Sequence, residues 1–123
     1  MIGSERITRA RDTGTDARTA RIRQLNDALR QYAHSGVICI TAGIQALGER
    51  GVEAALLAVR AFDDFSTDND PYAEHDFGAV HVGRARIFWK IDYYDLERRG
   101  GSPDPADPAV TTRVLTIMLA SEY

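Results

Sequence analysis

The dipeptide Gly83-Arg84 lies between two runs rich in β-branched and aromatic residues. This pattern is typical of a two-residue β-hairpin turn, because glycine readily takes the positive φ angle that the first turn position needs. The turn fixes the register of the two strands and sets Gly78 opposite Trp89. One face of the predicted hairpin is apolar and carries Val80, Val82, Ile87, Trp89, Ile91 and Tyr93. We therefore expect an antiparallel sheet with one covered face, on which Trp89 lies across the bare backbone of Gly78.

Apolar residues at helical spacing predict three helices, over about 17–34, over about 49–63 and from 108 onward. The last starts at Asp107-Pro108, an N-cap followed by proline, and is apolar over more than half of its circumference. A β-branched run after Gly36 predicts one further strand, and the chain from 42 to 48 predicts a turn or a single helical turn. The expected fold is α+β, with three helices packed on a small antiparallel sheet in the order α-β-α-β-β-α, a hairpin before the end and a buried last helix.

A chain of 123 residues with 44% hydrophobic and 27% charged residues has the composition of one globular domain. Residues 1–15 are polar without an apolar period, so we expect a flexible arm there and a single domain over 16–123. No stretch resembles a signal peptide or a membrane span. The one cysteine, Cys39, stands in an apolar run, which predicts a buried thiol. We expect a cytoplasmic protein without membrane contact.

Between residues 63 and 76 the chain is strongly acidic and contains no Lys or Arg. The segment holds Asp63, Asp64, Asp68, Asp70, Glu74, Asp76 and His75. One interpretation is that the polar residues from Ser66 to Pro71 form internal turns. The other is a divalent cation site, with Asp70, Glu74, His75 and Asp76 as ligands. The spacing does not fit an EF-hand, and no HExxH, CxxC or GKS/T motif occurs, so we expect no cofactor.

The polar face of the hairpin offers two further candidates, Lys90 and Asp92. The predicted register sets His75 opposite Asp92, and an aspartate can orient a histidine for acid–base chemistry. No nucleophile is evident beside this pair, so a cross-strand surface pair is the favoured interpretation. A PD-(D/E)xK nuclease is excluded, because Phe88 stands two residues before Lys90 where that motif needs an acid.

Nucleic acid is a further candidate ligand, because arginines over 6–23 could follow phosphates and Phe88 or Tyr94 could stack on a base. The acidic segment argues against it, and direct nucleic acid binding is not expected. The carboxylates could instead imitate phosphates and attract a basic protein.

Three stretches of the chain carry a family resemblance. They are Arg60–Phe65 continuing through Asp68–Tyr72 and Glu74–Gly78, then Phe88–Asp95, then Asp104–Ala120. They resemble an uncharacterised bacterial family of small proteins, classed as a domain of unknown function and common in alphaproteobacteria, on plasmids and on integrated elements. The resemblance implies no catalytic residue. Occurrence on mobile DNA implies an accessory role, such as plasmid maintenance or the blunting of a host defence system.

We therefore predict a non-enzymatic, protein-binding accessory module encoded on mobile DNA, acting as an acidic inhibitor or mimic on a nucleic-acid-handling or host-defence protein. Its expected binding residues are Asp63, Asp64, Asp68, Asp70, Glu74, His75, Asp76, Lys90 and Asp92. The alternative is a metal-dependent hydrolase or nuclease that uses the acidic segment. Whether the chain forms a homo-oligomer is left open.

Overall fold

The computed structural model describes the backbone of residues 2–123 and the side chains from Asp16 onward. The elements follow in the order α1 (Ile2–Tyr32), β1 (Val37–Ile40), α2 (Ala42–Gln45), α3 (Gly48–Ala61), β2 (Phe77–Val82), β3 (Ala85–Tyr94), η1 (Pro108–Val110), β4 (Thr112–Leu119) and η2 (Ala120–Glu122). The strands form one sheet in the order β1-β4-β3-β2. The predicted α+β class is confirmed, but the sheet is mixed, because β1 runs parallel to β4 while the other pairs are antiparallel.

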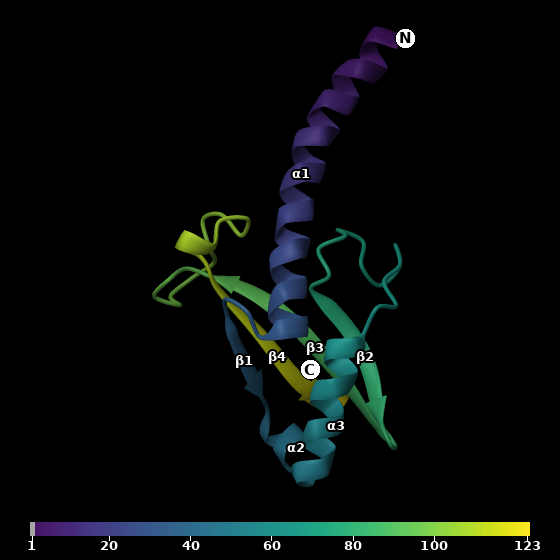
Figure 1. Ribbon diagram of the computed structural model, residues 1–123, viewed down its shortest axis with the longest axis vertical. Helices are drawn as coiled ribbons and strands as arrows, with labels where there is room; N and C mark the ends of the chain where they lie inside the picture. Colours follow the sequence, from purple (N-terminus) through teal and green to yellow (C-terminus); the bar gives the residue numbers. More distant parts are fainter. Residues whose placement is uncertain (1) are drawn as a thin grey trace.

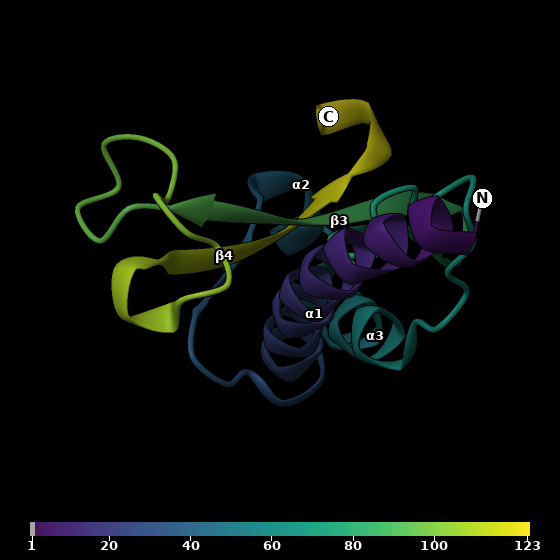
Figure 2. The ribbon, with the colours of Figure 1, turned by 90° about the horizontal axis from the view of Figure 1, so that it is seen from above.

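The fold has two main layers, with α1 and α3 on one face of the sheet and the C-terminal turn η2 on the other (Figures 1 and 2). Leu29 of α1 and Val59 of α3 pack with Trp89 of β3 and Ile117 of β4 in the core between the layers. These side chains are fully or almost fully buried. The helices therefore cover one face of the sheet, while α1 continues beyond the sheet at its N-terminal end (Figure 1).

The predicted hairpin is confirmed in detail. Gly83 has a φ of 57° in the turn between β2 and β3, and the register pairs Gly78 with Trp89. The indole covers Gly78 so closely that a Cβ added there would lie 2.5 Å from the Trp89 Nε1. The face predicted to be apolar is the one that packs on the helices, with Ile87 and Ile91 buried beside Trp89.

The predicted last helix is wrong, because the chain from Thr112 to Leu119 is strand β4. This strand lies between β1 and β3 and is buried on both faces, with Leu115 on the helix side and Met118 on the other. A strand covered on both faces loses the alternation of polar and apolar residues, so its pattern resembles that of a buried helix. The predicted N-cap at Asp107 is present, but it caps only the short η1 turn. Its Oδ1 accepts a hydrogen bond from the Ala109 amide at 2.9 Å.

Two smaller predictions also need correction. Cys39 is exposed, because β1 is an edge strand and Cys39 pairs with Thr116 on the face turned away from the helices. Helix α1 begins at Ile2 rather than near residue 17, so its helical backbone also includes residues 2–15, where a flexible arm was expected. The flexibility of that segment and its separation from the domain stay predictions. No helix in the described part of the chain is long and apolar enough to cross a membrane.

Candidate functional site

The acidic loop, defined as residues 63–76, connects α3 to β2. Its first half folds on itself: the Asn69 side chain accepts from the Ser66 amide at 2.9 Å and donates to the Asp64 carbonyl at 2.7 Å. The Asp70 amide donates to the Ser66 carbonyl at 2.8 Å. These bonds form an internal turn over residues 66–70, within the segment Ser66 to Pro71 where turns were predicted. Short polar side chains thus give the loop a defined backbone without a helix or strand.

Aromatic packing attaches the start of the loop to the core. Phe62 and Phe65 lie edge-on to each other, with ring centroids 4.9 Å apart, and both lie edge-on to Trp89. Helix α1 holds the second half of the loop, because Arg23 donates to the Ala73 carbonyl at 2.8 Å. The loop is therefore fixed at both ends.

A buried polar network links this loop to the sheet. Asn26 of α1 is fully buried and donates to the Glu74 carbonyl at 2.9 Å and to the Tyr93 hydroxyl at 2.7 Å. The Tyr93 hydroxyl donates to the Glu74 carboxylate at 2.8 Å, and Arg113 of β4 donates from Nε to Asn26 Oδ1 at 2.6 Å. Burial raises the pKa of Tyr93 well above its usual value and lowers the pKa of Arg113. The Glu74 side chain is thus used inside the fold.

A second buried cation, Arg30, ties α1 to the end of α3. Its Nη1 donates to three carbonyls, those of Val59, Arg60 and Phe62, at 3.0, 3.2 and 2.8 Å. Its Nη2 lies 3.2 Å from Asp27 Oδ1. These contacts place a cation at the C-terminal end of α3, where it interacts favourably with the partial negative charge of the last carbonyls.

His75 does not pair with Asp92 as predicted. It lies before β2 with a φ of 55°, so it is outside the ladder that the register argument extended to it. Its imidazole stacks on Phe65 at a centroid distance of 3.6 Å, and its Nδ1 lies 2.9 Å from Asp27 Oδ1. Its Nε2 lies 3.7 Å from Asp70 Oδ2. The aspartate partner of His75 is thus Asp27 of α1 and not Asp92 of the hairpin.

The predicted site residues consequently separate into groups. Asp63, Asp64 and Asp68 are exposed, and Tyr72 beside them is 76% exposed. Lys90 and Asp92 pair with each other at 2.5 Å on the sheet face opposite the helices. That pairing raises the pKa of Lys90.

Asp76 and Glu74 take no part in a common ligand set with Asp70 and His75. Burial, assisted by the negative charge of Glu74, raises the pKa of Asp76, while the Glu74 carboxylate faces Tyr93. Within the part of the chain that the structure describes, no group of three or more His, Cys, Asp or Glu is arranged to hold a metal ion. The cation site suggested by the sequence stays a prediction, and its four candidate ligands do not converge on one point in the described part of the chain.

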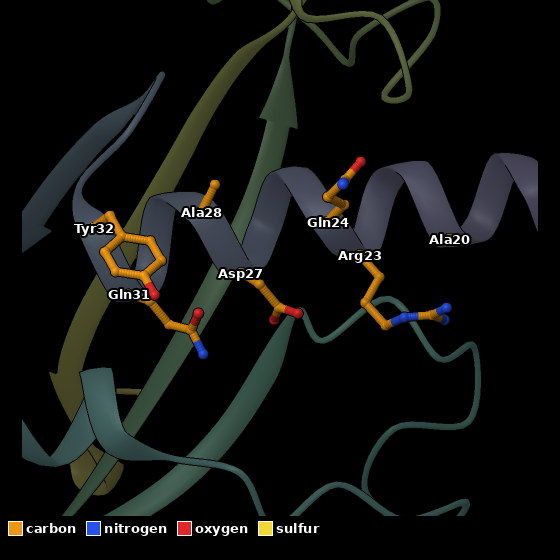
Figure 3. A pocket seen from close by; sticks show the side chains of 7 residues that line it. All are labelled: Ala20, Arg23, Gln24, Asp27, Ala28, Gln31 and Tyr32. Atoms are coloured by element: carbon orange, nitrogen blue, oxygen red, sulfur yellow. The ribbon is translucent and has the colours of Figure 1, made fainter.

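Two hollows border these groups. One, of about 340 Å³, follows α1, and Figure 3 shows Arg23 and Asp27 pointing from that helix toward the acidic loop while Gln24 points away. The other, of about 300 Å³, lies within the acidic loop itself and is lined by Phe65, Ser66, Thr67, Asp70, Ala73 and His75. The second hollow is lined by two titratable side chains of the loop, Asp70 and His75.

Sequence reasoning missed Asn26, Asp27, Arg30, Tyr93 and Arg113 as residues that build this site. A signal for two of them was present, because Asn26 and Arg30 lie on the helix face that carries Ile22 and Leu29. A polar residue on a buried stripe needs a partner from another element.

A family described as "Protein of unknown function (DUF3768)" matches residues 40–122. The match includes β2, β3, β4 and the whole acidic loop, and it begins at the last residue of β1. It leaves out the whole of α1, which supplies Asn26, Asp27 and Arg30 to the site. No match was found among curated proteins or among solved structures.

Proposed function

Because the chain belongs to the DUF3768 family, whose description assigns no role, we propose a function from the geometry: the protein is a non-enzymatic module that docks its acidic loop on a basic protein partner. The proposal rests on one observation, namely that the polar side chains of the loop fall into an inward-facing group and a solvent-facing group. Asn69, Asp70 and Glu74 bond inward and fix the backbone, whereas Asp63, Asp64 and Asp68 face solvent.

A loop of this kind suits recognition for two physical reasons. Its backbone is already ordered by hydrogen bonds, so a partner does not have to order it on binding. It also presents Tyr72, and tyrosine is among the residues that contribute most to protein interfaces. The exposed carboxylates add steering toward a positively charged surface.

The partner class follows from the charge. We propose a protein that handles nucleic acid or serves in host defence, because carboxylates along a loop can occupy a surface built for phosphates. Under the same proposal the protein is a cytoplasmic accessory module encoded on mobile DNA.

The geometry supports a binding role better than it supports acyl-transfer catalysis. His75 is oriented by Asp27, and Ser66 lines the same hollow. However, the Ser66 hydroxyl accepts from the Asn69 amide at 3.4 Å, and no hydrogen bond joins it to His75 among the described residues. A nucleophile–base contact is the feature that such chemistry needs.

The test is capture of partners from a host lysate by the full chain and by two charge-matched variants. Asp63→Asn/Asp64→Asn/Asp68→Asn removes three charges from the loop. Glu49→Gln/Glu53→Gln/Glu97→Gln removes three exposed charges from other surfaces. We expect basic proteins held by the native chain and by the second variant to be lost from the first. Equal capture by both variants would contradict the proposal.

A further inference from the structure

The hollow inside the acidic loop contains a carboxylate with unused hydrogen-bonding capacity. Asp70 is only 7% exposed, and its Oδ1 accepts from the His75 amide at 3.2 Å. Its Oδ2 accepts no hydrogen bond from the described part of the chain, and His75 Nε2 lies 3.7 Å from it. A carboxylate with most of its surface removed from water gains more from an added donor than a carboxylate at the surface does.

The imidazole beside it presents a second free acceptor. The Asp27 carboxylate lies 2.9 Å from His75 Nδ1 and accepts the Nδ1 hydrogen, so in the neutral imidazole Nε2 carries a lone pair. Nε2 and Asp70 Oδ2 therefore face each other as two acceptors across 3.7 Å, at the wall of a hollow of about 300 Å³.

Among the described residues, the two carboxylates that flank His75 differ in their Lys and Arg partners. Asp27 is matched by Arg30, whose Nη2 lies 3.2 Å from it. Among the described residues no Lys or Arg lies within salt-bridge distance of Asp70. The exposed Asp63, Asp64 and Asp68 on the same loop add further negative charge.

We propose that this hollow is a subsite for the guanidinium of an arginine on the partner, an inference that rests on the proposed function. A planar guanidinium carries several N–H donors in a fixed fork, so one group donates to Asp70 Oδ2 and to His75 Nε2 at once. A lysine ammonium is a more strongly hydrated point charge and loses more water on entering a half-enclosed site.

Binding of oligoarginine and oligolysine peptides of equal length to the full chain tests this, measured by calorimetry at low ionic strength. We expect the native chain to bind oligoarginine roughly tenfold more tightly, as one additional charge-assisted hydrogen bond would give. Asp70→Asn should reduce that preference to near unity and leave oligolysine affinity little changed. Thr67→Leu, which fills the hollow without altering Asp70 or His75, should do the same and decides the outcome if Asp70→Asn fails to fold.

Equal affinity of the native chain for the two peptides, or an arginine preference that survives Thr67→Leu, overturns the subsite. The Asp63→Asn/Asp64→Asn/Asp68→Asn variant separates this result from the proposed function. If it binds both peptides as tightly as the native chain does, the docking role of the loop fails. If the variant binds both peptides more weakly than the native chain does, and neither protein prefers oligoarginine, the docking role stands and the subsite fails.

Discussion

Replacing Asn26 by alanine should loosen the acidic loop and destabilise the whole domain. Asn26 is fully buried and makes three hydrogen bonds, to the Glu74 carbonyl, the Tyr93 hydroxyl and Arg113 Nε. The two neutral bonds contribute about 1 kcal/mol each, and the bond to the charged guanidinium about 1.5–3 kcal/mol. Since Arg113 is only 2% exposed, water does not readily replace its lost partner. The expected loss is therefore about 3.5–5 kcal/mol, out of a typical total of about 5–15 kcal/mol.

Urea unfolding followed by the fluorescence of Trp89, the one tryptophan, measures this loss. Gln24→Ala is the matched control, because Gln24 lies exposed on the same helix and accepts a hydrogen bond only from Arg21 among the described residues. Its effect should stay within about 0.5 kcal/mol. Tyr93→Phe should cost about 1–2 kcal/mol, and the double variant Asn26→Ala/Tyr93→Phe less than the sum of the single ones. An Asn26→Ala effect no larger than that of Gln24→Ala would refute the network.

Three further outcomes follow from the structure. Gly78→Ala should destabilise by about 1–3 kcal/mol in the same urea assay because its Cβ meets the Trp89 indole, whereas Gly100→Ala should change little; equal effects would contradict the packing. Asp76→Asn should raise stability at neutral pH, because the raised pKa of Asp76 means that ionisation of this carboxyl disfavours the folded state. The gain should vanish when the pH falls below 3.8, the usual pKa of an aspartate. A pH series in which the variant is less stable than the native chain at neutral pH would oppose this. Adding Mg²⁺, Mn²⁺ or Zn²⁺ after treatment with EDTA should leave the melting temperature unchanged. A bound metal at a hundredfold excess over Kd would add about 2.7 kcal/mol of stability and raise the melting temperature by several degrees. Such a rise in the native chain, if it disappears in His75→Ala, would favour the metal-dependent alternative.

The sequence was most informative where one local signal fixes a backbone conformation. Gly83 determined the turn, and the turn determined the register that places Trp89 on Gly78. It was least informative for β4, because a strand buried on both faces has the same apolar density as a buried helix. Neighbouring strands on both sides decide between the two, and that information is not local.

The candidate site was predictable only in part, for a related reason. The clustering of acids over 63–76 is a fact of sequence, but their division into inward and outward groups depends on partners contributed by α1, β3 and β4. The position of His75 illustrates this, because extension of the hairpin register pointed to Asp92 while a left-handed backbone turn directs the ring to Asp27. Partners so distant along the chain leave only an indirect trace, such as Asn26 on an otherwise apolar stripe.

The central claim, that the acidic loop is a preformed docking surface, is tested most directly by an NMR titration of the isotope-labelled full chain with oligoarginine peptide. We predict saturable amide shifts confined to residues 63–76 and the facing turn of α1, with the signals of the half-buried sheet residues Lys90 and Asp92 unmoved. Shifts centred on the sheet face, or spread evenly over the surface without saturation, would contradict it.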